Sequence, residues 1–146
     1  MTAAEKTVEI VLRNEPPQMA VLRNAFDHMS KENGIPDTAQ MQLQVAIDEI
    51  VSNVIKYAWP QGEKHELLVR IEVNNTAAVV HVIDDGKAFD PRQAPSRERP
   101  PPGKRPRPGG LGVQMVKGLV DKFEYTRNNG RNHTVLTKFY SAGVTK

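Results

Sequence analysis

The sequence predicts an α+β fold, a two-layer α/β sandwich with helices on one face of a mixed, mostly antiparallel sheet. Strand and helix patterns follow one another in the order strand, helix, helix, strand, strand, loop, helix, strand, strand. Two pairs of adjacent strands, within 66–84 and 123–140, are each joined by a short turn, which argues against a purely parallel doubly wound sheet. The 146 residues carry no internal repeat, so we expect one domain over residues 1–146.

The N-terminal half of the chain should form one strand and two helices. Residues 7–13 are rich in β-branched side chains, which favours a strand. The prolines at 16–17 end this strand and suit a helix entry. Apolar residues then recur at helical spacing from 18 to about 33, where Gly34 ends the run. A second helix starts near 36–38 with a single apolar stripe. The stripe consists of Leu43, Ala46, Ile47, Ile50 and Val54.

The C-terminal half should form two hairpins separated by a loop and a helix. Residues 66–73 alternate inward and outward side chains, and after a turn at 74–76 a second strand runs to Asp84. The inward set is Leu67, Val69, Ile71 and Val73, with Arg70 and Glu72 facing outward. Glycines at 109–112 then lead into a short helix, and a hairpin closes on the turn at 128–130. We expect Met115, Val116 and Leu119 of that helix to be buried.

Composition and charge exclude several classes of protein. With 38% hydrophobic and 25% charged residues the chain is typical of a globular protein. The absence of Cys excludes a disulfide framework and a thiolate metal site. No apolar run approaches the ~20 residues that span a membrane, and the N-terminus has no signal-peptide pattern, so we expect a soluble, cytoplasmic protein without a membrane partner.

The net charge of +3 has a local origin. Much of the positive charge lies in a Pro- and Arg-rich segment at about 91–108, for which we expect no regular secondary structure. A basic loop is weaker support for nucleic-acid binding than a basic face with interleaved aromatic residues. We therefore predict no direct nucleic-acid partner, although a basic nucleic-acid-binding domain is a third interpretation of the chain.

Three polar motifs interrupt this pattern. Glu49 and Asn53 are four residues apart on the second helix, so they share one face; a carboxylate there can act as a base and an amide oxygen can bind Mg²⁺. Asp84 ends a strand, and Gly86 permits a sharp turn beside a ligand. The glycines at 109–112 precede a helix, where exposed N–H groups form an anion site. Taken alone, the first two motifs are better explained by a polar helix edge and a plain turn, and the third is a weak signal.

In this order along one chain, the motifs resemble those of the GHKL ATPase superfamily. The resemblance is closest to the anti-sigma-factor serine kinases of bacterial partner-switching systems. EIVSNVIKYAW (49–59) matches the N box, DDGKAFDP (84–91) the first Gly box, and GGLGVQMV (109–116) the second. Two positions depart from the pattern: Ala88 replaces the last glycine of the wider superfamily's first Gly box, and His133 stands where glycine is common.

The resemblance implies a Bergerat-type ATP-binding fold and a role for each motif. Glu49 would be the catalytic base, and Asn53 would hold Mg²⁺ on the nucleotide. Asp84 would accept the adenine amine, with Thr134 beside it. The remaining positions expected to contact ATP are Lys56, Gly86, Ala88, Gly110, Leu111, Gly112 and Val113. Segment 91–108 would be the ATP lid, with Arg105 and Arg107 approaching the phosphates or the protein partner.

The function implied is an ATP- and Mg²⁺-dependent serine/threonine protein kinase. Its substrate would be a serine on a small STAS-type anti-sigma-factor antagonist. The resemblance also implies a homodimer that acts as an anti-sigma factor or regulates one, with a sigma factor as a further partner. The alternative is a non-catalytic ATP-binding protein that sequesters its partner, and the retention of Glu49 favours the kinase.

Overall fold

The computed structural model describes residues 6–93 and 112–141. Its elements are β1 (Lys6–Arg13), α1 (Gln18–Glu32), α2 (Asp37–Tyr57), β2 (Glu66–Val73), β3 (Ala77–Asp84), a 3₁₀ turn η1 (Pro91–Gln93), α3 (Gly112–Leu119), β4 (Lys122–Asn128) and β5 (Arg131–Phe139). This order confirms the predicted succession of strands and helices, with η1 as an addition.

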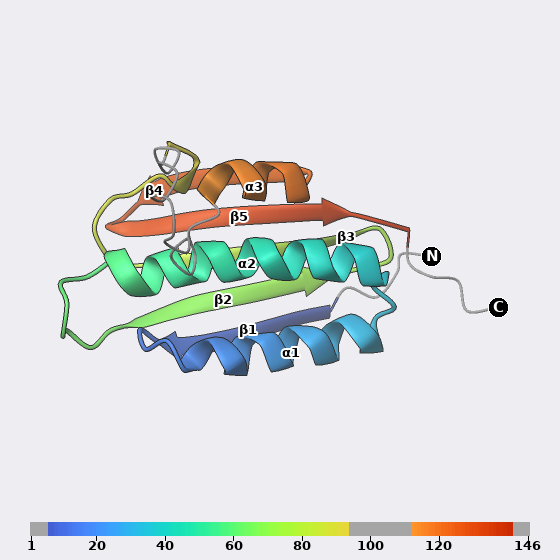
Figure 1. Cartoon of the computed structure of the whole chain (residues 1–146), viewed down its shortest axis with the longest axis horizontal. Helices are drawn as coiled ribbons and strands as arrows, with labels where there is room; N and C mark the ends of the chain where they lie inside the picture. Colours follow the sequence, from blue (N-terminus) through green and yellow to red (C-terminus); the bar gives the residue numbers. More distant parts are fainter. Residues whose placement is uncertain (1–5, 94–111, 142–146) are drawn as a thin grey trace, which may run out of the picture.

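The five strands form one sheet in the order β1-β2-β3-β5-β4. All four pairings between these strands are antiparallel. The three helices lie across one face of the sheet, so the predicted two-layer sandwich is confirmed (Figure 1). The tight turn between β4 and β5 has positive φ at Asn129 (53°) and Gly130 (74°), which matches the twist of a two-residue hairpin.

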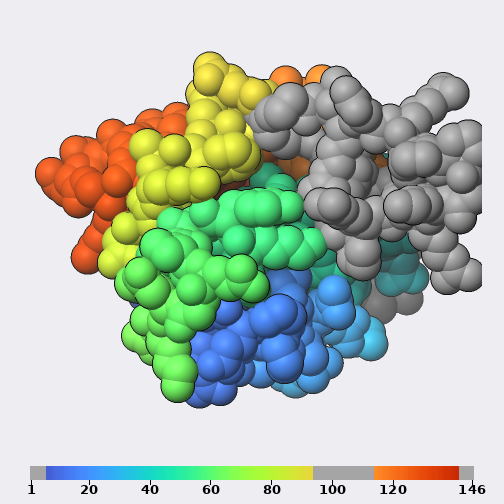
Figure 2. Space-filling view, turned by 60° about the vertical axis from the view of Figure 1, so that its left-hand side comes forward, coloured from blue at the N-terminus to red at the C-terminus, as the bar shows by residue number. Residues whose placement is uncertain are grey.

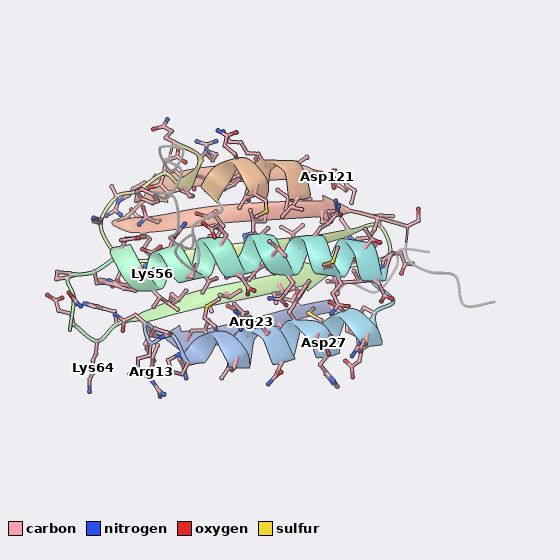
Figure 3. The ribbon with its side chains drawn as sticks, in the orientation of Figure 1. Arg13, Arg23, Asp27, Lys56, Lys64 and Asp121 are labelled. Carbon is pink, nitrogen blue, oxygen red and sulfur yellow. The ribbon has the colours of Figure 1, made fainter. Side chains whose placement is uncertain are left out.

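The core lies between the helices and the sheet. On β2 the predicted alternation is confirmed, since every second side chain is buried. The predicted stripe of α2 is buried from Leu43 to Ile50, while Val54 is partly buried at the end nearer the pocket described below. Arg23 extends from α1 toward α2 (Figure 3), and its guanidinium bonds both carboxylate oxygens of Asp48 at 3.2 Å.

Helix α3 is less buried than its sequence predicts. Val116 is 1% exposed, whereas Met115 and Leu119 are only partly buried. The helix lies beside α2 and over the edge of the sheet that β4 and β5 form (Figure 1). One row of its side chains therefore reaches the core, and the flanking rows stay partly in solvent.

The expectation of no regular structure in segment 91–108 is wrong at its first residues, which form η1. Asp90 explains this turn, because its carboxylate accepts the Arg92 backbone N–H at 2.9 Å and the Arg92 guanidinium at 2.8 and 3.0 Å. A carboxylate that bonds the backbone two residues ahead is a common way to start a turn. Residues 94–108 of the expected lid lie outside the described residues.

None of the helices in the described part of the chain combines the length and the apolar character needed to cross a membrane.

Candidate functional site

A pocket opens between the C-terminal half of α2, the loop after β3, and β5. The space between its walls is about 370 Å³, which includes open solvent at its mouth. Its walls are formed by Ile50, Asn53, Val54, Tyr57, Ala58, Asp84, Lys87, Phe89, Pro91, Asn132 and Thr134. In Figure 2 the loop after β3 lies between the end of α2 and the β4–β5 hairpin. Segments far apart in the sequence thus meet here.

Asp84 lies in this pocket at the end of β3 and is 5% exposed. Its Oδ1 atom accepts two hydrogen bonds, from the Gly86 backbone N–H at 2.9 Å and from the Asn132 side-chain amide at 3.0 Å. Burial raises the pKa of the Asp84 carboxyl above its ordinary value, and these two hydrogen bonds offset part of the rise. The carboxylate is held from one side and can accept a further donor with its other oxygen.

Gly86 fixes the loop after β3 against the end of α2. A Cβ atom at Gly86 would lie 2.4 Å from the carbonyl oxygen of Ala58 and 2.5 Å from its Cβ. The next residue, Lys87, donates its backbone N–H to that same carbonyl at 2.8 Å. Only glycine allows so close an approach. Gly86 therefore acts at this site through backbone packing, and neither Gly86 nor Ala88 is among the residues that line the pocket.

Asn53 and Glu49 come from the same face of α2. Asn53 lines the pocket, and its Oδ1 atom is buried without a hydrogen-bond partner in the described residues. A buried amide oxygen left unpaired costs free energy unless a ligand satisfies it. Glu49, one turn earlier, is 7% exposed, an unusual burial for a carboxylate on a helix. Glu49 does not itself form part of the pocket wall.

The unpaired Asn53 oxygen fits a Mg²⁺ ion bound together with a phosphorylated ligand. Mg²⁺ prefers hard oxygen ligands and takes few of them from protein. Residues 6–93 and 112–141 contain no group of three or more His, Cys, Asp or Glu side chains that could hold a metal ion. Phosphate and water oxygens would therefore supply most of the ion's ligands beside Asn53.

The other predicted positions separate into three groups. Thr134 lies in the pocket wall and is 5% exposed. Lys56 lies near the C-terminal end of α2 (Figure 3) but does not line the pocket. Gly112 and Val113 begin α3, whereas Gly110 and Leu111 lie outside the described residues.

Several residues of the pocket, above all Asn132, were not predicted from the sequence. This side chain is 4% exposed and pairs in register with Asp84 across β3 and β5. A signal was present, since Asn132, Thr134 and Leu136 alternate inward along β5. The alternation becomes informative only once the hairpin register places Asn132 opposite Asp84.

Two histidines meet on the opposite face of the sheet from the pocket. His81 Nδ1 lies 2.8 Å from His133 Nε2, and a Glu72 carboxylate oxygen contacts the other nitrogen of His81. Burial lowers the pKa of His133, and the nearby charges of His81 and Arg70 lower it further. On the neighbouring strand β4, Glu124 lies two residue pairs along from His133 in the register.

Comparisons with known proteins agree with this geometry. The family model described as a histidine kinase-like ATPase domain matches residues 12–138. The serine/threonine-protein kinase BtrW of Bordetella bronchiseptica is 26% identical over 116 residues, which cover 77% of this chain and 79% of that protein. The serine-protein kinase RsbW of Bacillus velezensis is 24% identical over 143 residues, which cover 95% of this chain and 89% of that protein.

A solved structure shares the fold. The crystal structure of the RsbU and RsbW domains of a Mycobacterium tuberculosis protein aligns with a TM-score of 0.67 and 17% identity. The alignment covers 96% of this chain and 35% of that longer chain. At this identity the likeness concerns the arrangement of helices and strands alone.

Proposed function

This chain belongs to the family of histidine kinase-like ATPase domains, and from that premise we propose that it is the serine kinase of a partner-switching module. In this proposal it transfers the γ-phosphoryl group of Mg·ATP to a serine on a small STAS-type antagonist protein. Its curated relatives are named serine or serine/threonine protein kinases, which confirms the sequence-based prediction at the level of protein-serine kinase activity. The substrate and partners are inferred.

One observation carries the assignment to this site. Asp84 and Asn53 line the same pocket, and among the described residues the Asp84 carboxylate is bonded at Oδ1 only and the Asn53 amide oxygen has no partner. A carboxylate with a vacant oxygen suits the amine of adenine, and an amide oxygen suits a metal ion on the phosphates. The two groups match the two ends of Mg·ATP.

Each residue of the site has its own role in phosphoryl transfer. Asp84 accepts the adenine amine, and apolar Ile50 and Val54 from α2 line the pocket and exclude water. Asn53 would hold Mg²⁺, which would neutralise charge on the phosphates. The N-terminus of α3 at Gly112 presents backbone N–H groups to an anion. Glu49 accepts the proton of the attacking serine, because a carboxylate near the reacting hydroxyl can act as general base.

The second candidate is an ATP-binding protein that sequesters an anti-sigma antagonist or a sigma factor without transferring phosphate. Both candidates use the same pocket, and in both we infer a homodimer. The position of Glu49 on the same face of α2 as Asn53, one turn earlier, favours the kinase, because a carboxylate placed there can act as the general base.

Incubation with γ-labelled ATP, Mg²⁺ and the STAS-type product of a neighbouring gene separates the two candidates. The proposal predicts that label appears on a serine of the small protein. A stable complex with that protein in the presence of ATP, with no label transferred, would favour the sequestering protein.

A further inference from the structure

Asn132 connects the ligand-facing carboxylate to the edge of the sheet. Its side-chain nitrogen donates to Asp84 Oδ1 at 3.0 Å and to the Lys87 carbonyl at 2.8 Å. Its side-chain oxygen accepts from the Tyr125 hydroxyl, from the Arg127 guanidinium at 3.1 Å and from the Phe89 backbone N–H at 3.4 Å. The buried amide thereby joins β3, the following loop, β4 and β5.

The partners of Asn132 fix which way its amide points. An arginine guanidinium and a backbone N–H can only donate, so they require the oxygen on their side. An ionised carboxylate and a backbone carbonyl can only accept, so they require the nitrogen on theirs. A flipped amide would set donors against donors and acceptors against acceptors at once. Asn132 is therefore an obligatory donor to Asp84.

This donor saturates one oxygen of Asp84 and leaves the other vacant. Oδ1 accepts from both Gly86 and Asn132, while within residues 6–93 and 112–141 Oδ2 has no hydrogen bond. A carboxylate gripped at one oxygen cannot rotate freely to present either atom. The vacant oxygen is thus held in one place in a pocket that Asn53 also lines.

We propose that Asn132 is a positioning residue that sets the preference of the pocket for a 6-aminopurine by holding Asp84 at Oδ1 and presenting Oδ2 to the base. This inference rests on the proposed function, because it assumes that the ligand is ATP. It goes further by assigning base selectivity to a residue outside the family motifs found in the sequence.

The charges around Asp84 agree with this role. Arg127 donates to the Gly86 carbonyl at 2.7 Å as well as to Asn132, so its positive charge lies near Asp84. Arg127 lowers the pKa of Asp84, whereas the negative charge of Asp85 raises it. Lys87 lies in the pocket wall. The pocket residues of α2 are all uncharged. The hydrogen bond from the neutral Asn132 amide is the strongest influence that lowers the pKa of Asp84 against the rise caused by burial, and it also orients the carboxylate.

Binding of two nucleotides to the full chain tests the inference. Calorimetry compares ATP with the triphosphate of purine riboside, which lacks the 6-amino group but carries the same phosphates. The ratio of the two affinities isolates the contact with the amine. Asn132→Ala removes the amide, and Asn128→Ala removes an exposed asparagine of the same hairpin as the control. Thermal unfolding of each variant checks that the fold is kept.

A second variant keeps the shape of the side chain. Asn132→Asp retains an oxygen for Tyr125 and Arg127 but replaces the donor to Asp84 by an acceptor. At pH 6 a proton shared between the two carboxylates can restore the missing donor, and at pH 8 it is lost. Selectivity in Asn132→Asp should therefore rise as the pH falls, while the wild-type ratio changes little.

We expect the wild type to prefer ATP over the analogue and Asn132→Ala to lose about tenfold of that preference, the usual effect of losing one buried hydrogen bond. Asn128→Ala should keep it. If Asn132→Ala weakened both nucleotides equally and Asn132→Asp showed no pH-dependent recovery, Asn132 would be merely structural and the inference wrong. If the wild type bound neither nucleotide, the proposed function would fail first and this inference with it.

Discussion

Gly86→Ala tests how the pocket is built, because it forces the loop after β3 away from α2. The new methyl group would meet the Ala58 carbonyl oxygen at 2.4 Å, the Ala58 Cβ at 2.5 Å and the Ala58 carbonyl carbon at 2.8 Å. Carbon atoms in proteins do not approach other heavy atoms this closely without a bond, and two of the three obstacles are backbone. The loop must therefore move, which breaks the bond from Lys87 N–H to Ala58.

The cost follows from two effects. Overpacking of a tight contact destabilises by about 1–3 kcal/mol, and the lost backbone hydrogen bond adds about 1 kcal/mol. We expect the free energy of unfolding to fall by roughly 2–4 kcal/mol. For a domain of this size each kcal/mol lowers the melting temperature by about 2–4 °C, so the loss should be on the order of 10 °C. ATP affinity should fall as well, since the Gly86 N–H holds Asp84.

Differential scanning calorimetry and denaturant unfolding measure the stability of Gly86→Ala and of a control variant. Gly118→Ala is the matched control, because Gly118 lies in α3 and a Cβ there meets nothing within 4 Å. The same added methyl group should leave stability unchanged or raise it by up to about 1 kcal/mol. A Gly86→Ala protein that melts within 1 °C of the wild type would show that the loop is not clamped on α2, and the pocket geometry derived from that clamp would be wrong.

Three further predictions concern single groups. Because the free Asp84 oxygen would face the six-position carbonyl of GTP without a donor between them, ATP should bind about ten- to a hundredfold more tightly than GTP; equal affinities in calorimetry would refute the adenine contact. Asn53→Ala should reduce the gain in ATP affinity that Mg²⁺ brings, and titrations with and without EDTA that match wild type would exclude Asn53 as a metal ligand. Since burial, with the charges of His81 and Arg70, lowers the pKa of His133, the unfolded chain takes up its proton more readily. The contribution of His133 to stability is therefore full above about pH 6.5 and declines as the pH falls below it. His133→Phe should flatten this decline in melting temperature between pH 7.5 and 5.5, and an equally steep decline would contradict the assignment.

Local patterns in the sequence predict most of the fold. The alternation on β2, the apolar stripe of α2 and the turn at Asn129 and Gly130 each depend on neighbouring residues alone. The degree of burial of α3 could not be predicted in this way. It depends on the position of the helix over the edge of the sheet, and the strand order decides which strands form that edge.

The residues of the site also differ in whether the sequence alone could predict them. Asp84, Asn53 and Thr134 belong to motifs that can be read along the chain, and all three line the pocket. Asn132 belongs to no motif, and its role comes from the register of β3 and β5, which pairs it with Asp84. Gly86 was expected beside the ligand, but its tightest contact is with Ala58 at the end of α2. Only the three-dimensional structure shows that a motif residue acts through packing.

The rate of phosphoryl transfer by Glu49→Gln tests the central claim most directly. In a single turnover at saturating Mg·ATP, with the STAS-type partner as acceptor, we expect transfer to slow by about 10²–10⁴-fold, the usual contribution of a general base. ATP affinity should stay near that of the wild type, because the base acts mainly in the transition state. Glu32→Gln, at an exposed position on α1, should transfer at the wild-type rate. If Glu49→Gln transferred phosphate as fast as the wild type, Glu49 would not be the base and the catalytic site would have to lie elsewhere.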